Sequence, residues 1–133
     1  MAEKIAFELV SPDRLLVSEA VDMVVIPGTE GDFGVLHGHQ PLVAMVRPGI
    51  LEIENEGTPN RRIYVTGGFA EVTNDRCAVL TEDAVAVEDL KRADLEQRIK
   101  NAEEALEAAT SDNDRYLIEA QLSTLRDIAQ AAS

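Results

Sequence analysis

The sequence has one cysteine, Cys77, and no tryptophan among its 133 residues. A single thiol cannot form an internal disulfide or a cysteine-based zinc site. Because Cys77 lies in an apolar run, we expect a small buried side chain rather than a reactive thiol. With only three phenylalanines and two tyrosines, the core must be mainly aliphatic.

Long apolar segments are also missing. No uninterrupted apolar run approaches the ~20 residues that a helix needs to cross a bilayer. The first residues, Met-Ala-Glu-Lys-Ile-Ala-Phe, lack the cationic start and apolar run of a signal peptide. We therefore expect a soluble chain without direct membrane insertion.

Basic residues are scarce, with 12 lysines and arginines against 25 acidic residues and a net charge of −13. Such a chain repels a phosphate backbone, which argues against binding nucleic acid. It is equally unsuited to an anionic membrane surface. A basic protein partner fits this charge, although the excess is explained equally well as charge that keeps the protein soluble.

Glycine and proline are absent from Glu88 to Ser133, and this absence divides the chain in two. Before it, short runs rich in valine and isoleucine alternate with turns, most densely between Val25 and Gly49. Many short strands at this spacing are typical of a β-sandwich or barrel. The expected strands cover residues 5–10, 15–17, 21–26, 33–36, 42–46, 50–54, 62–66, 69–72 and 77–80.

The second part, residues 88–133, is rich in good helix formers. It carries two apolar stripes at helical spacing, separated by Thr110-Ser111-Asp112-Asn113-Asp114, which offers serine and aspartate caps for a second helix. The pattern predicts an antiparallel α-helical hairpin. Because its stripes are narrow and rich in alanine, we expect the hairpin to be less stable than the β-domain of residues 1–87 and able to detach.

Tests for catalytic and metal motifs fail. The glycine-rich segment has no Gly-Lys-Ser/Thr and opens no helix, so it is not a phosphate loop. His37 and His39 would project from one face of an extended segment, but a third metal ligand is missing nearby. Ser11 and Ser18 lack a nucleophile elbow. We therefore expect neither an enzyme active site nor a metal site.

The chain resembles the epsilon subunit of F-type ATP synthases, which is called delta in mitochondria. The likeness covers nearly the whole length, and it depends on the order and spacing of several segments rather than on any one of them. These segments are Phe7–Pro12, Pro27–Leu36, Gly38–Leu42, Arg47–Gly49, Gly67–Val72 and Leu80–Ala84.

The resemblance implies a ten-stranded β-sandwich followed by two helices. It also implies a non-catalytic rotor subunit in the central stalk of a proton-translocating enzyme, peripheral on the cytoplasmic face of the bacterial inner membrane. Its partners would be the γ subunit, the ring of c subunits and, through the hairpin, the α/β head. The Thr29–Asp32 turn (Thr29, Glu30, Gly31 and Asp32) and His39 would lie at one end of the sandwich, facing the c-ring and the foot of γ.

In many members of that family the hairpin regulates ATP hydrolysis, and in some it binds ATP through an Ile/Leu-Asp-x-x-Arg-Ala motif. Asp89, Arg92 and Ala93 match its core, which makes ATP a candidate regulatory ligand rather than a resident cofactor. Glu88 replaces the apolar residue, and its charge is unfavourable beside a phosphate. The following arginine, Arg98, is shifted by one position.

Two other interpretations remain at this point. One is a β-sandwich enzyme or metal-binding protein of the cupin type, which should retain a metal that His39→Ala abolishes. The other is a free adaptor whose hairpin binds a different coiled coil. For the hairpin itself we expect weak inhibition or none, because its second helix carries only two arginines, Arg115 and Arg126.

Overall fold

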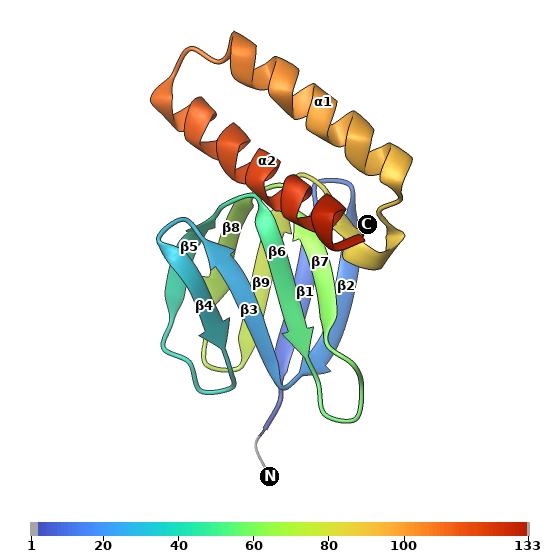
Figure 1. The fold of residues 1–133 in the computed structure, drawn as a ribbon. Helices are drawn as coiled ribbons and strands as arrows, with labels where there is room; N and C mark the ends of the chain where they lie inside the picture. Colours follow the sequence, from blue (N-terminus) through green and yellow to red (C-terminus); the bar gives the residue numbers. More distant parts are fainter. Residues whose placement is uncertain (1–2, 133) are drawn as a thin grey trace.

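The computed structural model describes residues 3–132, which form ten strands followed by a short 3₁₀ turn and two helices (Figure 1). The ten strands that the resemblance implies are therefore confirmed. The strands are β1 (Ile5–Ser11), β2 (Arg14–Val21), β3 (Met23–Gly28), β4 (Gly31–Val35), β5 (Leu42–Val46), β6 (Gly49–Glu54), β7 (Arg61–Val65), β8 (Gly68–Val72), β9 (Arg76–Thr81) and β10 (Ala84–Ala86).

The strands form one sheet that folds over into two layers. Their order is β10-β7-β6-β3-β5-β8-β9-β1-β2, and β4 pairs with β3 beside this path. β3 and β5 are joined at a single position, Gly28 opposite Val46, and there the sheet turns from one layer to the other. The inner faces of both layers enclose an aliphatic core that includes Ile5, Phe7 and Leu9 of β1.

Each layer also carries a row of apolar side chains on its outer face. In one layer Ile50, Tyr64 and Val85 lie directly opposite each other on β6, β7 and β10. These three side chains belong to a second apolar cluster that includes residues of both helices. The first row is therefore covered by the helices, and it fixes where the hairpin packs.

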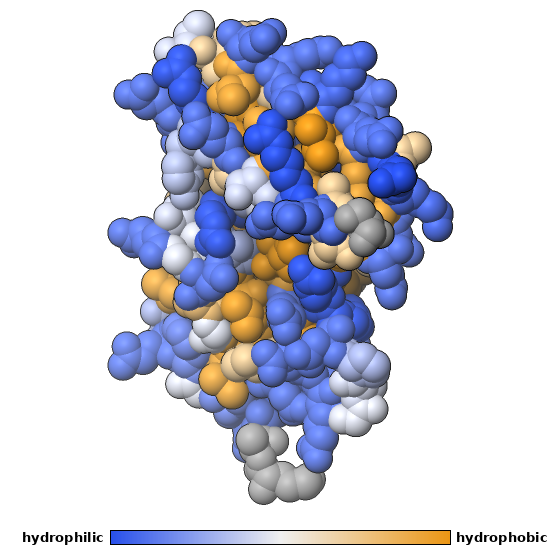
Figure 2. All heavy atoms as spheres, viewed as in Figure 1, coloured by the Kyte–Doolittle hydropathy of each residue, from blue (hydrophilic) through white to orange (hydrophobic). Residues whose placement is uncertain are grey.

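The helices are α1 (Arg92–Ala108) and α2 (Asp112–Ala132), preceded by the 3₁₀ turn Val87–Asp89. Ser111 caps α2 as expected, because its Oγ accepts the backbone N–H of Asp114 at 3.0 Å. Figure 1 shows α2 against the sandwich with α1 outside it. In Figure 2 apolar atoms line the seam between the hairpin and the sandwich, while the outer sides of the helices are mostly polar.

The strand boundaries differ from the sequence prediction around Asp22. The strands expected at 15–17 and 21–26 are present, but their expected bounds are wrong, because β2 runs to Val21 and β3 starts only at Met23. Asp22 is where the chain passes from pairing with β1 to pairing with β6. Its backbone N–H donates to Glu54 O at 3.1 Å and its carboxylate accepts the N–H of Glu56 at 2.5 Å. These contacts come from segments distant in sequence, so local periodicity could not locate the break.

Candidate partner-binding surfaces

The Thr29–Asp32 turn joins β3 to β4 and is held in place by β5 and by Arg47, the residue that follows β5. Arg47 donates to Gly28 O and to the carboxylate of Asp32, both at 2.7 Å. The backbone N–H of Thr29 donates to Met45 O at 3.0 Å. Gly31 adopts a φ of 129°, a conformation that favours glycine. The turn is thus a fixed, exposed feature whose backbone does not depend on a partner.

The same turn contacts the hairpin. The hydroxyl of Tyr116, in the first turns of α2, donates to Thr29 O at 3.2 Å. This bond links residues that are 87 positions apart in the sequence. The turn and the start of α2 therefore lie side by side, which the sequence pattern did not reveal.

His39 lies at the opposite end of the sandwich from the turn. β4 runs from Gly31, at the end of β3, to Val35, opposite Val24 near the start of β3. The segment that follows β4 approaches the β8–β9 connection, where Gly38 N–H donates to Asn74 O at 2.5 Å. The expectation that Thr29–Asp32 and His39 share one end is wrong, because β4 carries the chain along the length of the sandwich between them.

The second apolar row crosses the layer that the hairpin does not cover. It contains one residue from each of five adjacent strands, and each residue lies opposite the next: Met45 (β5), Phe69 (β8), Leu80 (β9), Val10 (β1) and Leu15 (β2). Four of these side chains are among the exposed large apolar residues, with 61%, 40%, 37% and 53% exposure for Met45, Phe69, Leu80 and Leu15. We call this set the uncovered row. Apolar side chains gathered on one exposed face mark a site of protein contact.

Sequence reasoning missed the uncovered row, although each of its strands was expected. The signal is that large apolar residues occupy outward positions on neighbouring strands. It can be recognised only when the strand register and the parallel pairing of β1 and β9 are known. Such long-range pairing cannot be derived from period-two alternation within single strands.

The residues of the partial ATP motif are exposed. Asp89 ends the 3₁₀ turn, and Arg92 and Ala93 begin α1. A groove of about 670 Å³ lies nearby between β2 and β7, and Ala86, Val87 and Glu88 line it, but Asp89, Arg92 and Ala93 do not. The hairpin therefore presents these three residues to solvent rather than enclosing a nucleotide-sized space with them.

The histidines are engaged in local contacts. His37 Nε2 lies 2.9 Å from the carboxylate of Glu3, and His39 Nδ1 lies 2.6 Å from Gln40 O. Over residues 3–132 no group of three histidine, cysteine or acidic side chains is arranged to hold a metal ion. Within that same range no helix has the length and apolar character to span a bilayer.

Comparison with known proteins identifies the family to which this architecture belongs. The profile of a family described as the β-sandwich domain of the ATP synthase delta/epsilon chain matches residues 4–87. The ATP synthase epsilon chain of Rhodospirillum centenum is 51% identical over 129 residues, covering 93% of this chain and 88% of the relative. The chain belongs to the ATP synthase delta/epsilon family.

Further relatives agree with this membership. The epsilon chain of Parvibaculum lavamentivorans is 48% identical over 96% of this chain and 97% of its own length. A solved structure of the Euglena gracilis mitochondrial ATP synthase, comprising OSCP, F1 and c-ring, contains a chain that superposes with a TM-score of 0.75 at 28% identity, covering 98% of this chain and 82% of that one. The resemblance to epsilon subunits is thus confirmed over both parts of the chain.

Proposed function

We propose that this chain is the non-catalytic subunit of the ATP synthase central stalk that joins the γ subunit to the membrane c-ring. Family membership supports the proposal, and so does the likeness to a chain in a solved assembly of F1 and c-ring. The observation that carries it is the uncovered row, a second apolar face on a small sandwich whose first apolar face is already occupied by its own hairpin.

A rotor element must transmit torque without yielding. A sandwich with a close-packed aliphatic core resists deformation, and separate surfaces let it hold two partners at once. We assign the uncovered row to γ, because the core of a stable protein contact is apolar. We assign the acidic Thr29–Asp32 turn to basic loops of the c-ring, where charge sets register and association rate more than affinity. His39, at the far end, would contact a different part of the stalk.

Localisation follows from the same proposal. The curated relatives described above are bacterial. A stalk subunit of a bacterial enzyme would be peripheral, on the cytoplasmic face of the inner membrane, and held there through its protein partners.

The test is binding of the full-length chain to γ on size exclusion at one-to-one stoichiometry. We expect Phe69→Glu to weaken that complex at least tenfold, because it puts a charge in the centre of an apolar contact. Leu36→Glu is the matched control, since Leu36 is also exposed and apolar but does not belong to the uncovered row. Unchanged binding by Phe69→Glu would exclude the row as the γ surface, and no binding by the unaltered chain would refute the stalk assignment.

ATP is proposed only as a regulatory ligand of the hairpin, with Asp89, Arg92 and Ala93 as its candidate contacts. Glu88, next to Asp89, opposes the phosphates by its charge. We therefore expect weak binding, which Glu88→Ile should strengthen and Arg92→Ala should abolish in isothermal titration. Equal affinities for the unaltered chain and Glu88→Ile would show that ATP does not use this segment.

A further inference from the structure

Tyr64 lies in the centre of the apolar row that the hairpin covers. Tyr64 of β7 is 0% exposed, and it lies in a cluster with Leu90, Leu95, Leu125 and Ile128. Its buried hydroxyl faces Gln121 of α2 without meeting the geometry of a full hydrogen bond. The tyrosine thus contributes apolar contact, while its hydroxyl adds little that would hold the helices in one position.

Arg98 of α1 supplies a polar connection across this interface. One terminal nitrogen of its guanidinium lies 3.4 Å from the carboxylate of Asp83, on the connection between β9 and β10. Its central carbon lies 6.0 Å from the centroid of the Tyr64 ring, within the range of a cation–π contact. One side chain of the hairpin therefore contacts two groups of the sandwich.

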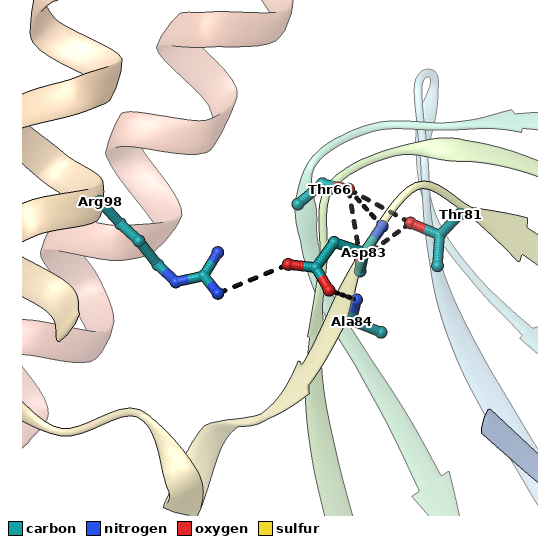
Figure 3. A network of polar contacts seen from close by, with 5 residues as sticks. All are labelled: Thr66, Thr81, Asp83, Ala84 and Arg98. Atoms are coloured by element: carbon teal, nitrogen blue, oxygen red, sulfur yellow. Dashed lines mark hydrogen bonds and ion pairs between the residues drawn. The ribbon is translucent and has the colours of Figure 1, made fainter. Parts of the chain in front are cut away.

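The sandwich fixes Asp83 without help from the hairpin (Figure 3). The carboxylate accepts the N–H of Ala84 at 2.9 Å. The backbone carbonyl of Asp83 accepts the hydroxyls of Thr66 at 3.2 Å and Thr81 at 3.1 Å, and its N–H donates to Thr66 Oγ1 at 3.1 Å. A carboxylate held in this way is already positioned to receive Arg98.

The other arginines with ion pairs in the hairpin do not reach the sandwich. Arg115 pairs with Asp112 of its own helix, and Arg126 of α2 pairs with Glu103 of α1. Among the ion pairs recorded for residues 3–132, the Arg98–Asp83 pair is the one that joins the hairpin to the β-domain. Its side chains are 30% and 56% exposed, so water and salt weaken it.

We propose that Arg98 is a latch that sets the balance between docked and released hairpin, by bridging the pre-positioned carboxylate of Asp83 and the face of Tyr64. The apolar cluster defines where the hairpin docks, and the latch adds a small free energy whose loss favours release while the β-domain stays folded. The latch belongs to the isolated chain, and only its consequence for the enzyme rests on the proposed stalk function.

Hydrogen exchange of the full-length chain tests the latch. Helices released from their packing surface are marginal in water, so backbone amides of residues 121–130 exchange faster whenever the hairpin undocks. We expect Arg98→Met, which keeps the apolar stem, to raise this exchange about three- to tenfold. Asp83→Asn keeps the backbone hydrogen bonds of residue 83 with Thr66 and Thr81, and it should raise the exchange rate less than Arg98→Met does. Amides of β1 and β9 should be unchanged in both variants.

Arg126→Met is the matched control, because it removes an ion pair inside the hairpin and no recorded contact with the sandwich. The latch is supported if exchange in residues 121–130 rises with Arg98→Met and Asp83→Asn and much less with Arg126→Met. It is overturned if Arg98→Met exchanges at the unaltered rate, or if Arg126→Met has an equal effect, which would indicate general hairpin stability.

A distance measurement separates release from local fraying. Spin labels can be attached at Asn113→Cys on α2 and Glu71→Cys on β8, because both positions are exposed. The native thiol is buried, so it should not react with the label. Arg98→Met should add a second, broader population of distances to that of the unaltered chain. A single unchanged distance would overturn the proposal. Because these measurements need no γ subunit, their failure is distinguishable from failure of the stalk assignment.

Discussion

At the scale of single residues, Cys77 shows how burial controls the reactivity of a side chain. The thiol is 0% exposed in the core between the two layers. Burial raises the pKa of Cys77 from 9.0 to about 12, and the nearby charge of Arg76 lowers it by a smaller amount. A thiol that stays protonated is a poor nucleophile, so we expect it to react with a disulfide reagent only after unfolding.

The raised pKa also predicts a loss of stability at alkaline pH. In the unfolded chain the thiol releases its proton above its ordinary pKa of 9.0, whereas in the folded protein it keeps the proton until about 12. The unfolded state therefore gains up to about 1.4 kcal/mol for each pH unit within that window. Below pH 9 the contribution is fully present.

Denaturant unfolding between pH 8 and 11 checks this slope. Cys77→Ala should be less stable overall because removal of the buried sulfur atom leaves a small cavity, but its stability should fall less steeply with pH. Burial also raises the pKa of Tyr64, which steepens the fall in both proteins alike. Parallel slopes for the two proteins would contradict the assignment to the thiol.

At the scale of elements, the sequence predicts what is local. The two helices, the Ser111 cap and the strands β6 to β9 are confirmed, because hydrophobic period and capping residues are local signals that lie within a few positions of each other. The sequence pattern did not predict the three-residue strand β10 or the break at Asp22, since each depends on a distant partner strand.

The surfaces were harder to predict than the elements, for the same reason. The Thr29–Asp32 turn could be located from its glycines, but its contact with Tyr116 needs the packed hairpin. Nothing in the sequence distinguishes Tyr64 from other strand residues, and its role becomes visible only in the structure, where the hairpin covers it. Its apolar neighbours on the same face, Ile50 and Val85, are contributed by other strands.

The cap of α2 gives a test at this scale. Ser111→Ala removes the acceptor for the Asp114 N–H, and we expect a cost of about 1 kcal/mol confined to the hairpin. Helical circular dichroism on heating should show an earlier loss of signal. Thr110→Ala, one position earlier in the same loop, is the control and should change little. An equal effect of both substitutions would show that the loop, rather than the cap, is responsible.

At the scale of the whole molecule, charge argues against strong inhibition by the tail. The net charge is −13. The two arginines of α2 are already engaged, Arg126 with Glu103 at 2.9 Å and Arg115 with Ala109 O at 3.3 Å. A hairpin that extends into the catalytic head and grips acidic surfaces needs free basic side chains, and this one would bring mainly acidic ones.

We therefore expect ATP hydrolysis by the assembled enzyme to change less than about twofold when the chain is shortened after Asp89, since a free energy below about 0.4 kcal/mol corresponds to such a ratio. The assay compares enzyme rebuilt with full-length and shortened chains at equal γ occupancy. Glu119→Lys with Asp127→Lys supplies α2 with basic residues, and inhibition should then appear. Strong inhibition by the unaltered chain that disappears on shortening would refute the argument from charge.

The shortened chain also lacks Arg98, so the test removes the latch together with the helices. Arg98→Met in the full-length chain separates the two, because it shifts the balance toward the released hairpin while leaving its acidic surface intact, and it should leave hydrolysis unchanged.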